Sequence, residues 1–141
     1  MKDMKKKFLV ATHGKLASGF QNSLTILAGR GADLVVVDAY LTNEDYTPII
    51  SDFINSINAD EQGIIFTDLY GGSVNQTAVT ELMRNKKEQI FVISNSNLAI
   101  ILSLVLTSES EIFTQKSVNE AINDCQVRLV STQLPEEEAL F

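Results

Sequence analysis

Short apolar runs alternate with longer segments of helical periodicity along this chain. The short runs, rich in β-branched residues, cover 8–11, 34–40, 64–67, 90–94 and 127–132. Helical spacing or helix-forming composition marks 16–27, a segment from about 46 to 57, 73–83, a segment from 98 onward and 117–124. This alternation is typical of βαβ units and a mainly parallel sheet. We therefore predict a three-layer, doubly wound α/β fold.

The strand order decides which polar residues meet. In a doubly wound sheet of order 2-1-3-4, the first and third strands are neighbours, and ligands bind at the crevice between their carboxyl ends. His13, the only histidine of the chain, follows the first strand, and Asp68 follows the third. Because neighbouring strands lie about 4.8 Å apart, we predict a hydrogen bond between the two side chains.

The pairing of His13 with Asp68 predicts that the imidazole acts as a nucleophile. A carboxylate that accepts the proton of one imidazole nitrogen fixes the tautomer and leaves the other nitrogen with a free lone pair. Two predicted helices begin at the same crevice, one after Gly14 and one at Gly71–Ser73, where we expect Ser73 to be the N-cap. Helix amino termini and close glycine backbones bind anions, so we expect Gly14, Gly71 and Gly72 to cradle a phosphate.

Taken singly, each of these residues is typical of an ordinary turn or helix start. Their joint placement favours phosphoryl transfer through a phosphohistidine, with His13, Asp68 and Ser73 as the catalytic residues. This chemistry needs no metal ion and no bound cofactor, and phosphoryl transfer depends mainly on positioning and charge stabilisation.

Composition narrows the setting and the partners. The 141 residues carry a net charge of −7, which disfavours nucleic acid and anionic membranes and favours a partner with a basic face. Cys125 is the only cysteine, and no export signal precedes the first strand, so we expect a reducing, cytoplasmic setting. The most apolar run, 98–106, is too short to cross a bilayer. We predict one domain over 1–132 and an acidic tail over 133–141.

Three strings in the chain resemble a known family. They are VATHG at 10–14, TDLYGGSVNQTA at 67–78 and VISNSN at 92–97. Together they resemble the IIA domains of the mannose/fructose/sorbose family of the sugar phosphotransferase system, over nearly the whole chain. One departure is that Leu98 and Ala99 follow Asn97, where the family often has an aliphatic residue, proline and methionine. This departure implies a different helix entry and different details of docking.

The resemblance implies a function and partners. In that family the histidine accepts a phosphoryl group from the phosphocarrier protein HPr and passes it to the IIB component, which works with the membrane components IIC and IID in sugar uptake. His13, Asp68 and Ser73 match the family's histidine, its aspartate partner and its phosphate-contacting serine. The resemblance also implies a homodimer in which a carboxyl-terminal strand, here Val127–Thr132, is exchanged between subunits.

Two alternatives remain open at this point. The related phosphotransferase subunit of dihydroxyacetone kinase uses a similar domain to phosphorylate a kinase-bound nucleotide. A receiver-like regulatory domain would instead be phosphorylated on Asp68, at the end of the third strand. Receiver domains bind Mg²⁺ through an acidic pair after the first strand, where this chain has Thr12 and His13, so the second alternative is disfavoured.

Overall fold

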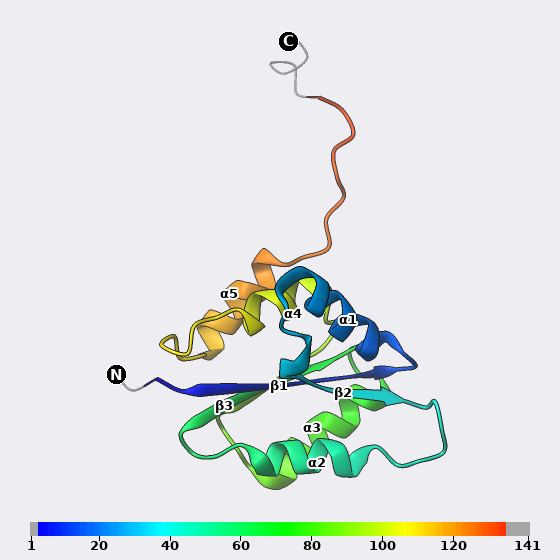
Figure 1. Cartoon of the computed structure of the whole chain (residues 1–141), viewed down its shortest axis with the longest axis vertical. Helices are drawn as coiled ribbons and strands as arrows, with labels where there is room; N and C mark the ends of the chain where they lie inside the picture. The colour runs from blue at the N-terminus through cyan, green and yellow to red at the C-terminus, as the bar shows by residue number, and fades with distance from the viewer. Residues whose placement is uncertain (1–2, 135–141) are drawn as a thin grey trace.

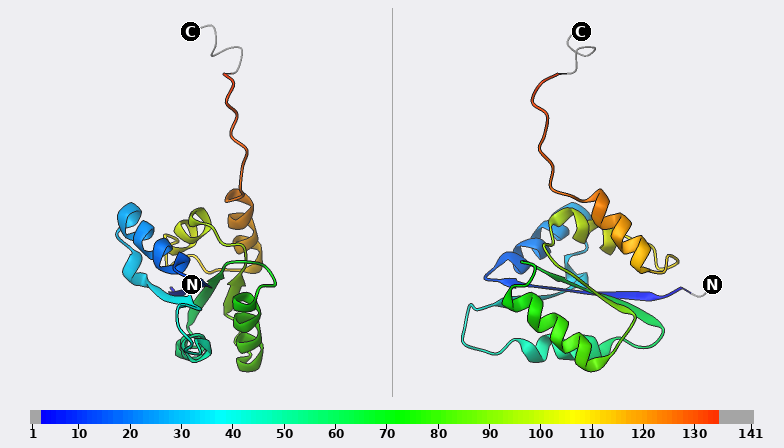
Figure 2. Two further views of the ribbon diagram at one scale, coloured as in Figure 1. Left: turned by 90° about the vertical axis from the view of Figure 1, so that its right-hand side faces the viewer. Right: turned by 180° about the vertical axis from the view of Figure 1, so that it is seen from behind.

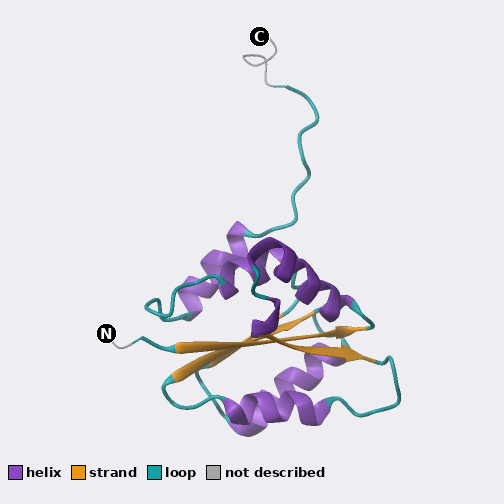
Figure 3. Cartoon of the chain, in the orientation of Figure 1, coloured by secondary structure: helices purple, strands orange, loops and turns teal. Residues whose placement is uncertain are grey.

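A parallel sheet lies between two layers of helices (Figure 1). The computed structural model describes residues 3–134. Its elements are β1 (Lys5–His13), α1 (Leu16–Ala28), the 3₁₀ helix η1 (Gly31–Asp33), β2 (Leu34–Ala39), α2 (Thr47–Ser56), β3 (Glu61–Thr67), α3 (Ser73–Asn85), β4 (Ile90–Ile93), α4 (Leu98–Val105) and α5 (Gln115–Asp124). Helices α1, α4 and α5 cover one face of the sheet, and α2 and α3 cover the other (Figures 1 and 3). The predicted three-layer α/β architecture is confirmed.

The sheet has the order β2-β1-β3-β4, and all its pairs are parallel. This is the order predicted from the sequence. The chain leaves β1 into α1 on one face and leaves β3 into α3 on the opposite face. The carboxyl ends of these adjacent strands therefore border the crevice in which doubly wound proteins bind their ligands.

Alternating side chains of β1 divide the core into two halves. Phe8 and Val10 pack toward α1, α4 and α5, whereas Leu9 and Ala11 pack toward α2 and α3. This is the two-residue period of a strand with helices on both faces. All seven residues of β3 are buried. The central strands therefore form a rigid base beneath the residues that follow them.

The central strands begin earlier than the apolar runs predict. β1 starts at Lys5 and pairs there with Glu61 of β3, so two polar stretches belong to the sheet. Nζ of Lys7 lies 3.2 Å from Oε1 of Glu61. Gln62 is buried because its side chain exchanges hydrogen bonds with the backbone of Phe113, at 2.8 and 2.7 Å. Specific partners thus bring polar residues into strands that hydrophobicity alone marks as loops.

The start of α4 is well capped despite the departure from the family pattern. Asn97 is the N-cap, and its Oδ1 accepts the backbone N–H of Ile100 at 2.9 Å. Its Nδ2 donates to the carbonyl of Cys125 at 2.7 Å, which joins the start of α4 to the end of α5. Leu98 and Ala99 therefore enter an ordinary first helical turn.

The segment after α5 extends away from the two helical layers (Figure 2). The segment Val127–Thr132, which the sequence predicts to be a strand, forms no strand in the single chain. The side chains of Val127, Leu129 and Val130 are 92%, 102% and 75% exposed. Pairing of this segment with a second subunit stays a prediction. Most of the predicted acidic tail, residues 135–141, lies outside the described residues.

Within the described range 3–134, every helix is too short or too polar to cross a membrane.

Candidate active site

His13 and Asp68 meet where β1 and β3 end. Nδ1 of His13 lies 2.7 Å from Oδ2 of Asp68, as the sequence predicted, and the backbone N–H of His13 donates to the same oxygen at 2.7 Å. Asp68 thus holds the residue at both its backbone and its ring. With Nδ1–H donating to the carboxylate, Nε2 carries the free lone pair. The imidazole is 44% exposed, so a partner molecule can approach it.

The environment of Asp68 keeps its carboxylate charged. Burial raises its pKa, but hydrogen bonds from the backbone and ring of His13 and from the backbone of Leu69 outweigh that effect. The net result is that the pKa of Asp68 lies below its ordinary value. The ionised form is the one that accepts Nδ1–H.

Ser73 faces the other side of the imidazole ring. Its Oγ lies 3.3 Å from Nε2 of His13. The prediction that Ser73 caps α3 is wrong, because Gly72 occupies the cap position with extended backbone and Ser73 is the first helical residue. The hydroxyl is therefore not used as a cap and lies beside the imidazole ring. The structure brings His13, Asp68 and Ser73 into one site.

The amides of the glycines in the predicted phosphate cradle already have partners within the protein. The N–H groups of Gly14, Gly71 and Gly72 already donate to the carbonyl of Ala39, to Oδ1 of Asn75 and to the carbonyl of Leu69. Gly14 and Gly71 have φ of +63° and +74°, in the left-handed region that favours glycine. These two residues allow the sharp turns that place His13 and Ser73.

The amino terminus of α3 offers more amides for an anion than that of α1 does. At the start of α1, the N–H groups of Ala17 and Ser18 donate to Oγ1 of Thr12 and to the carboxylate of Asp38. Asp38 also brings a negative charge there, which offsets the helix dipole. In α3 the first N–H that bonds within the helix is that of Gln76, to the carbonyl of Gly72. The preceding amides of α3 are therefore the donors suited to a phosphate.

Two asparagines hold the loop between β3 and α3 in place. Asn75 is buried, accepts the N–H of Gly71 at 3.1 Å and donates to Oγ1 of Thr67 at 2.9 Å. Asn95, in the turn after β4, accepts the N–H of Tyr70 at 2.9 Å. Asn75 holds the loop from α3 and Asn95 holds it from the turn after β4, so Ser73 has a defined position.

Tyr40 is a residue of the site that our sequence reasoning missed. It follows β2, whose last residue, Ala39, is the register partner of His13. Its ring centroid lies 5.1 Å from that of His13, and its hydroxyl lies 2.8 Å from Oγ of Ser73. The hydrogen bond with Ser73, and then that with Tyr46, lower the pKa of the Tyr40 phenol. The predicted sheet order could have indicated Tyr40, because it places the end of β2 beside His13.

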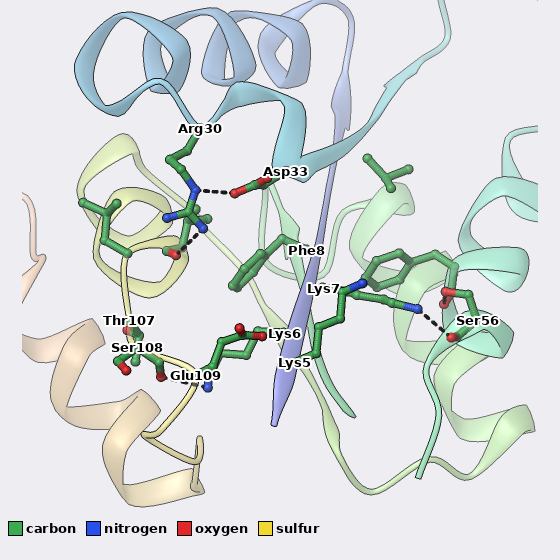
Figure 4. A pocket seen from close by; sticks show the side chains of 14 residues that line it. Lys5, Lys6, Lys7, Phe8, Arg30, Asp33, Ser56, Thr107, Ser108 and Glu109 are labelled. Carbon is green, nitrogen blue, oxygen red and sulfur yellow. Dashed lines mark hydrogen bonds and ion pairs between the residues drawn. The ribbon is translucent and has the colours of Figure 1, made fainter. Parts of the chain in front are cut away.

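A cavity of about 670 Å³ lies at the opposite end of the sheet (Figure 4). Four cationic residues line it: Lys5, Lys6, Lys7 and Arg30. The ammonium groups of Lys6 and Lys7 donate to backbone carbonyls, and Arg30 pairs with Asp33. Three of the four cationic groups are therefore already bound within the protein, and Lys7 and Arg30 each pair with a carboxylate. The reactive groups lie at the other end, around His13.

Across residues 3–134, no group of three or more His, Cys, Asp or Glu side chains is arranged to hold a metal ion.

Comparison with known protein families connects this site to a class of proteins. Residues 7–122 match the family described as the PTS system fructose IIA component, also called EIIA-man, where PTS is the sugar phosphotransferase system. The match covers most of the chain and includes His13, Asp68 and Ser73. The chain belongs to this family. The resemblance stated from the sequence strings is confirmed. Curated proteins gave no match to the chain.

Solved structures of IIA proteins have the same fold. A Klebsiella pneumoniae protein described as a permease of the phosphoenolpyruvate-dependent sugar phosphotransferase system is 28% identical, with a TM-score of 0.74 over 90% of this chain and 93% of that one. The mannose/sorbose-specific IIA subunit of Enterococcus faecalis is 20% identical, with a TM-score of 0.66 over 94% and 100%. A IIA protein associated with the fucose utilisation operon of Streptococcus pneumoniae is 19% identical, with a TM-score of 0.70 over all of both chains. The last two likenesses concern the fold alone.

Proposed function

We propose that this IIA component carries a phosphoryl group on Nε2 of His13, accepting it from HPr and passing it to a IIB component for sugar uptake. The observation that carries the proposal is the 2.7 Å contact between Nδ1 of His13 and Oδ2 of Asp68. That contact supports a ring proton on Nδ1, because a carboxylate accepts, and an Nε2 lone pair directed toward Ser73 and the solvent.

The chemistry is an in-line displacement at phosphorus. The lone pair of Nε2 forms the new nitrogen–phosphorus bond while the bond between phosphorus and the donor breaks, and its electron pair leaves with the donor. The Nδ1 proton stays in place, because the ionised Asp68 stabilises the positive charge that develops on the ring. The hydroxyl of Ser73 and the first amides of α3 then hydrogen-bond the phosphoryl oxygens. Transfer to the acceptor is the same displacement in reverse.

The surroundings of His13 suit partner proteins. Leu16 is 48% exposed at the start of α1, Leu41 is 50% exposed after Tyr40, and Leu69 is 66% exposed after Asp68. Exposed apolar side chains around a reactive group favour contact with another protein surface. The net charge of −7 favours partners with basic faces. In this role the protein works in the cytoplasm beside the membrane components IIC and IID.

A second part of the proposal concerns the segment Val127–Thr132, which we expect to be exchanged in a homodimer. Its apolar side chains are exposed in the single chain, and β4 is an edge strand whose outer side has no partner strand within residues 3–134. If this segment paired as a strand with β4 of another subunit, it would hydrogen-bond the backbone groups of that edge and cover its own apolar residues.

The direct test is phosphoryl transfer with purified components. The protein is incubated with labelled phosphoenolpyruvate, enzyme I and HPr, and label on the IIA protein is followed with and without HPr. We expect HPr-dependent labelling that is acid-labile and absent in His13→Ala. Label that persists in His13→Ala contradicts the proposal.

The same experiment separates the alternatives. An acyl phosphate on Asp68 would be sensitive to hydroxylamine and would require Mg²⁺, as expected of a receiver-like domain. Discharge to the subunits of a dihydroxyacetone kinase, and not to a IIB component, would assign the protein to that kinase. The two hydrogen bonds that Oδ2 of Asp68 accepts from His13 favour the phosphohistidine.

A further inference from the structure

Tyr40 has an uncommon backbone conformation beside His13. Its φ is +68°, in the left-handed region that bulky residues rarely occupy. The turn is held by the N–H of Gly14, which donates to the carbonyl of Ala39 at 2.8 Å. The aromatic ring contacts His13 on one side and packs edge-on against Tyr46, with centroids 5.6 Å apart. Strain of this kind, kept at a reactive group, points to a role in its chemistry.

The Tyr40 hydroxyl belongs to a ring of hydroxyl groups next to Nε2 of His13. It lies 2.8 Å from Oγ of Ser73 and 3.3 Å from the hydroxyl of Tyr46. The Tyr46 hydroxyl lies 3.3 Å from Oγ1 of Thr77, and Thr77 donates to the carbonyl of Ser73 at 2.9 Å. The ring thus starts and ends on Ser73, whose Oγ also lies 3.3 Å from Nε2.

Each hydroxyl has one hydrogen, so the hydrogen bonds that join Ser73, Tyr40 and Tyr46 can run in either of two directions. The Thr77 hydrogen stays on the Ser73 carbonyl in both. In the first arrangement Ser73 donates to Tyr40, Tyr40 to Tyr46 and Tyr46 to Thr77. The hydrogen of Ser73 then points away from the histidine, and the Nε2 lone pair is free to attack phosphorus.

In the second arrangement three hydrogens have rotated and no proton has moved between residues. Tyr46 donates to Tyr40, Tyr40 donates to Oγ of Ser73, and the hydrogen of Ser73 is free to point toward Nε2. The hydrogen bond between Tyr46 and Thr77 is given up in this arrangement. This arrangement suits a phosphorylated histidine, because Ser73 can donate to a phosphoryl oxygen while its own oxygen is still hydrogen-bonded. Tyr40 changes from acceptor to donor as the histidine is loaded.

We propose that Tyr40 is a positioning residue that sets the direction of the Ser73 hydroxyl, accepting its hydrogen while Nε2 is free and donating to its oxygen when Nε2 carries the phosphoryl group. This inference rests on the proposed phosphoryl-carrier function and adds a residue to it. Without the phenol, Nε2 is the remaining acceptor among the described residues for the Ser73 hydrogen, and a hydrogen bond to it would block the lone pair.

The test compares Tyr40→Phe with wild type in HPr-dependent phosphorylation of His13. Phe keeps the ring and loses the hydroxyl. We expect a rate about tenfold lower, the size typical of losing one hydrogen bond to a charged or reacting group. In a Ser73→Ala background, which has no hydroxyl to direct, Tyr40→Phe should change the rate less than twofold. The matched control is Tyr70→Phe, since Tyr70 is an exposed tyrosine of the neighbouring loop; it should match wild type.

A second measurement needs no phosphoryl donor. The ¹⁵N resonance of Nε2 in the unphosphorylated protein reports whether its lone pair accepts a hydrogen bond. We expect Tyr40→Phe, but not Tyr70→Phe, to move it toward the hydrogen-bonded position, and Ser73→Ala to abolish that shift.

Three outcomes overturn the inference about Tyr40: an unchanged rate and resonance in Tyr40→Phe, equal slowing in both backgrounds, or the same resonance shift without Ser73. Failure of HPr to phosphorylate the wild-type protein would instead contradict the proposed function. The resonance of Nε2 would still decide the hydroxyl direction in that case.

Discussion

One carboxylate oxygen of Asp68 fixes both the backbone and the ring of His13. Oδ2 lies 2.7 Å from the backbone nitrogen and 2.7 Å from Nδ1. The backbone contact sets where the end of β1 lies relative to β3, and the ring contact sets the tautomer. The same side chain therefore contributes to the stability of the fold and to the proposed chemistry, and the two contributions can be measured separately.

Asp68→Asn should slow phosphoryl transfer more than it disturbs the structure. The amide has about the same shape, but it provides one acceptor oxygen and no charge for the developing imidazolium. We expect the rate of HPr-dependent phosphorylation to fall about 10- to 100-fold with an unchanged circular dichroism spectrum. A wild-type rate in this variant would remove the orienting role of Asp68.

The contribution of Asp68 to stability should depend on pH with a defined sign. Hydrogen bonds hold its pKa below the ordinary value, so the carboxylate stabilises the folded state above the ordinary pKa of an aspartate. That stabilisation is lost as pH falls through the lower pKa of the folded state. In urea unfolding at pH 7 we expect the free energy of unfolding of the wild type to exceed that of Asp68→Asn by about 1–2 kcal/mol. The gap should persist to about pH 5 and close below about pH 4; a gap that stays constant to pH 3 would contradict this.

Gly71→Ala tests the turn that leads into Ser73. A Cβ at Gly71 meets no atom within 4 Å, so the φ of +74° is the main cost of the substitution. We expect a loss of about 1 kcal/mol in the free energy of unfolding. Gly19→Ala is the matched control, because its Cβ also meets nothing within 4 Å and it lies inside α1. That change should stabilise the protein by about 0.5–1 kcal/mol, and equal effects of the two substitutions would show that φ is not the cause.

Leu129→Asp tests the exchanged strand. Light scattering should give twice the chain mass for wild type and the single-chain mass for the variant, because a buried charge opposes the dimer contact. Gln133→Asp places the same charge at an exposed polar position beyond the proposed strand and should remain a dimer. A wild-type mass of one chain at every concentration would rule out the exchange.

Much of the site was predictable because topology determines it. Four of the five apolar runs identify the parallel strands, and the order 2-1-3-4 brings the ends of β1 and β3 together. His13 and Asp68 follow from those two facts and the strand spacing. Ser73 follows from its place in the loop after β3, although its exact position at the start of α3 depends on Gly72 as the cap.

The remaining features depend on individual hydrogen bonds that periodicity does not encode. Gln62 is polar and gives no strand signal in the sequence, and its burial depends on hydrogen bonds with the backbone of Phe113. The sequence suggests that the amides of Gly71 and Gly72 can bind a phosphate, but in the structure they donate to Asn75 and Leu69. Tyr40 falls at the end of an apolar run, and its contact with His13 depends on a left-handed turn that the run does not signal.

The central claim is that Nε2, and not Nδ1, of His13 carries the phosphoryl group. A two-dimensional ¹H–³¹P correlation spectrum of the phosphorylated protein tests it directly. Phosphorus on Nε2 lies three bonds from both carbon-bound protons of the ring, whereas phosphorus on Nδ1 lies three bonds from only one. We predict correlations from a single phosphorus to both ring protons of His13. A correlation to one ring proton alone, or phosphorus on another residue, would contradict the account.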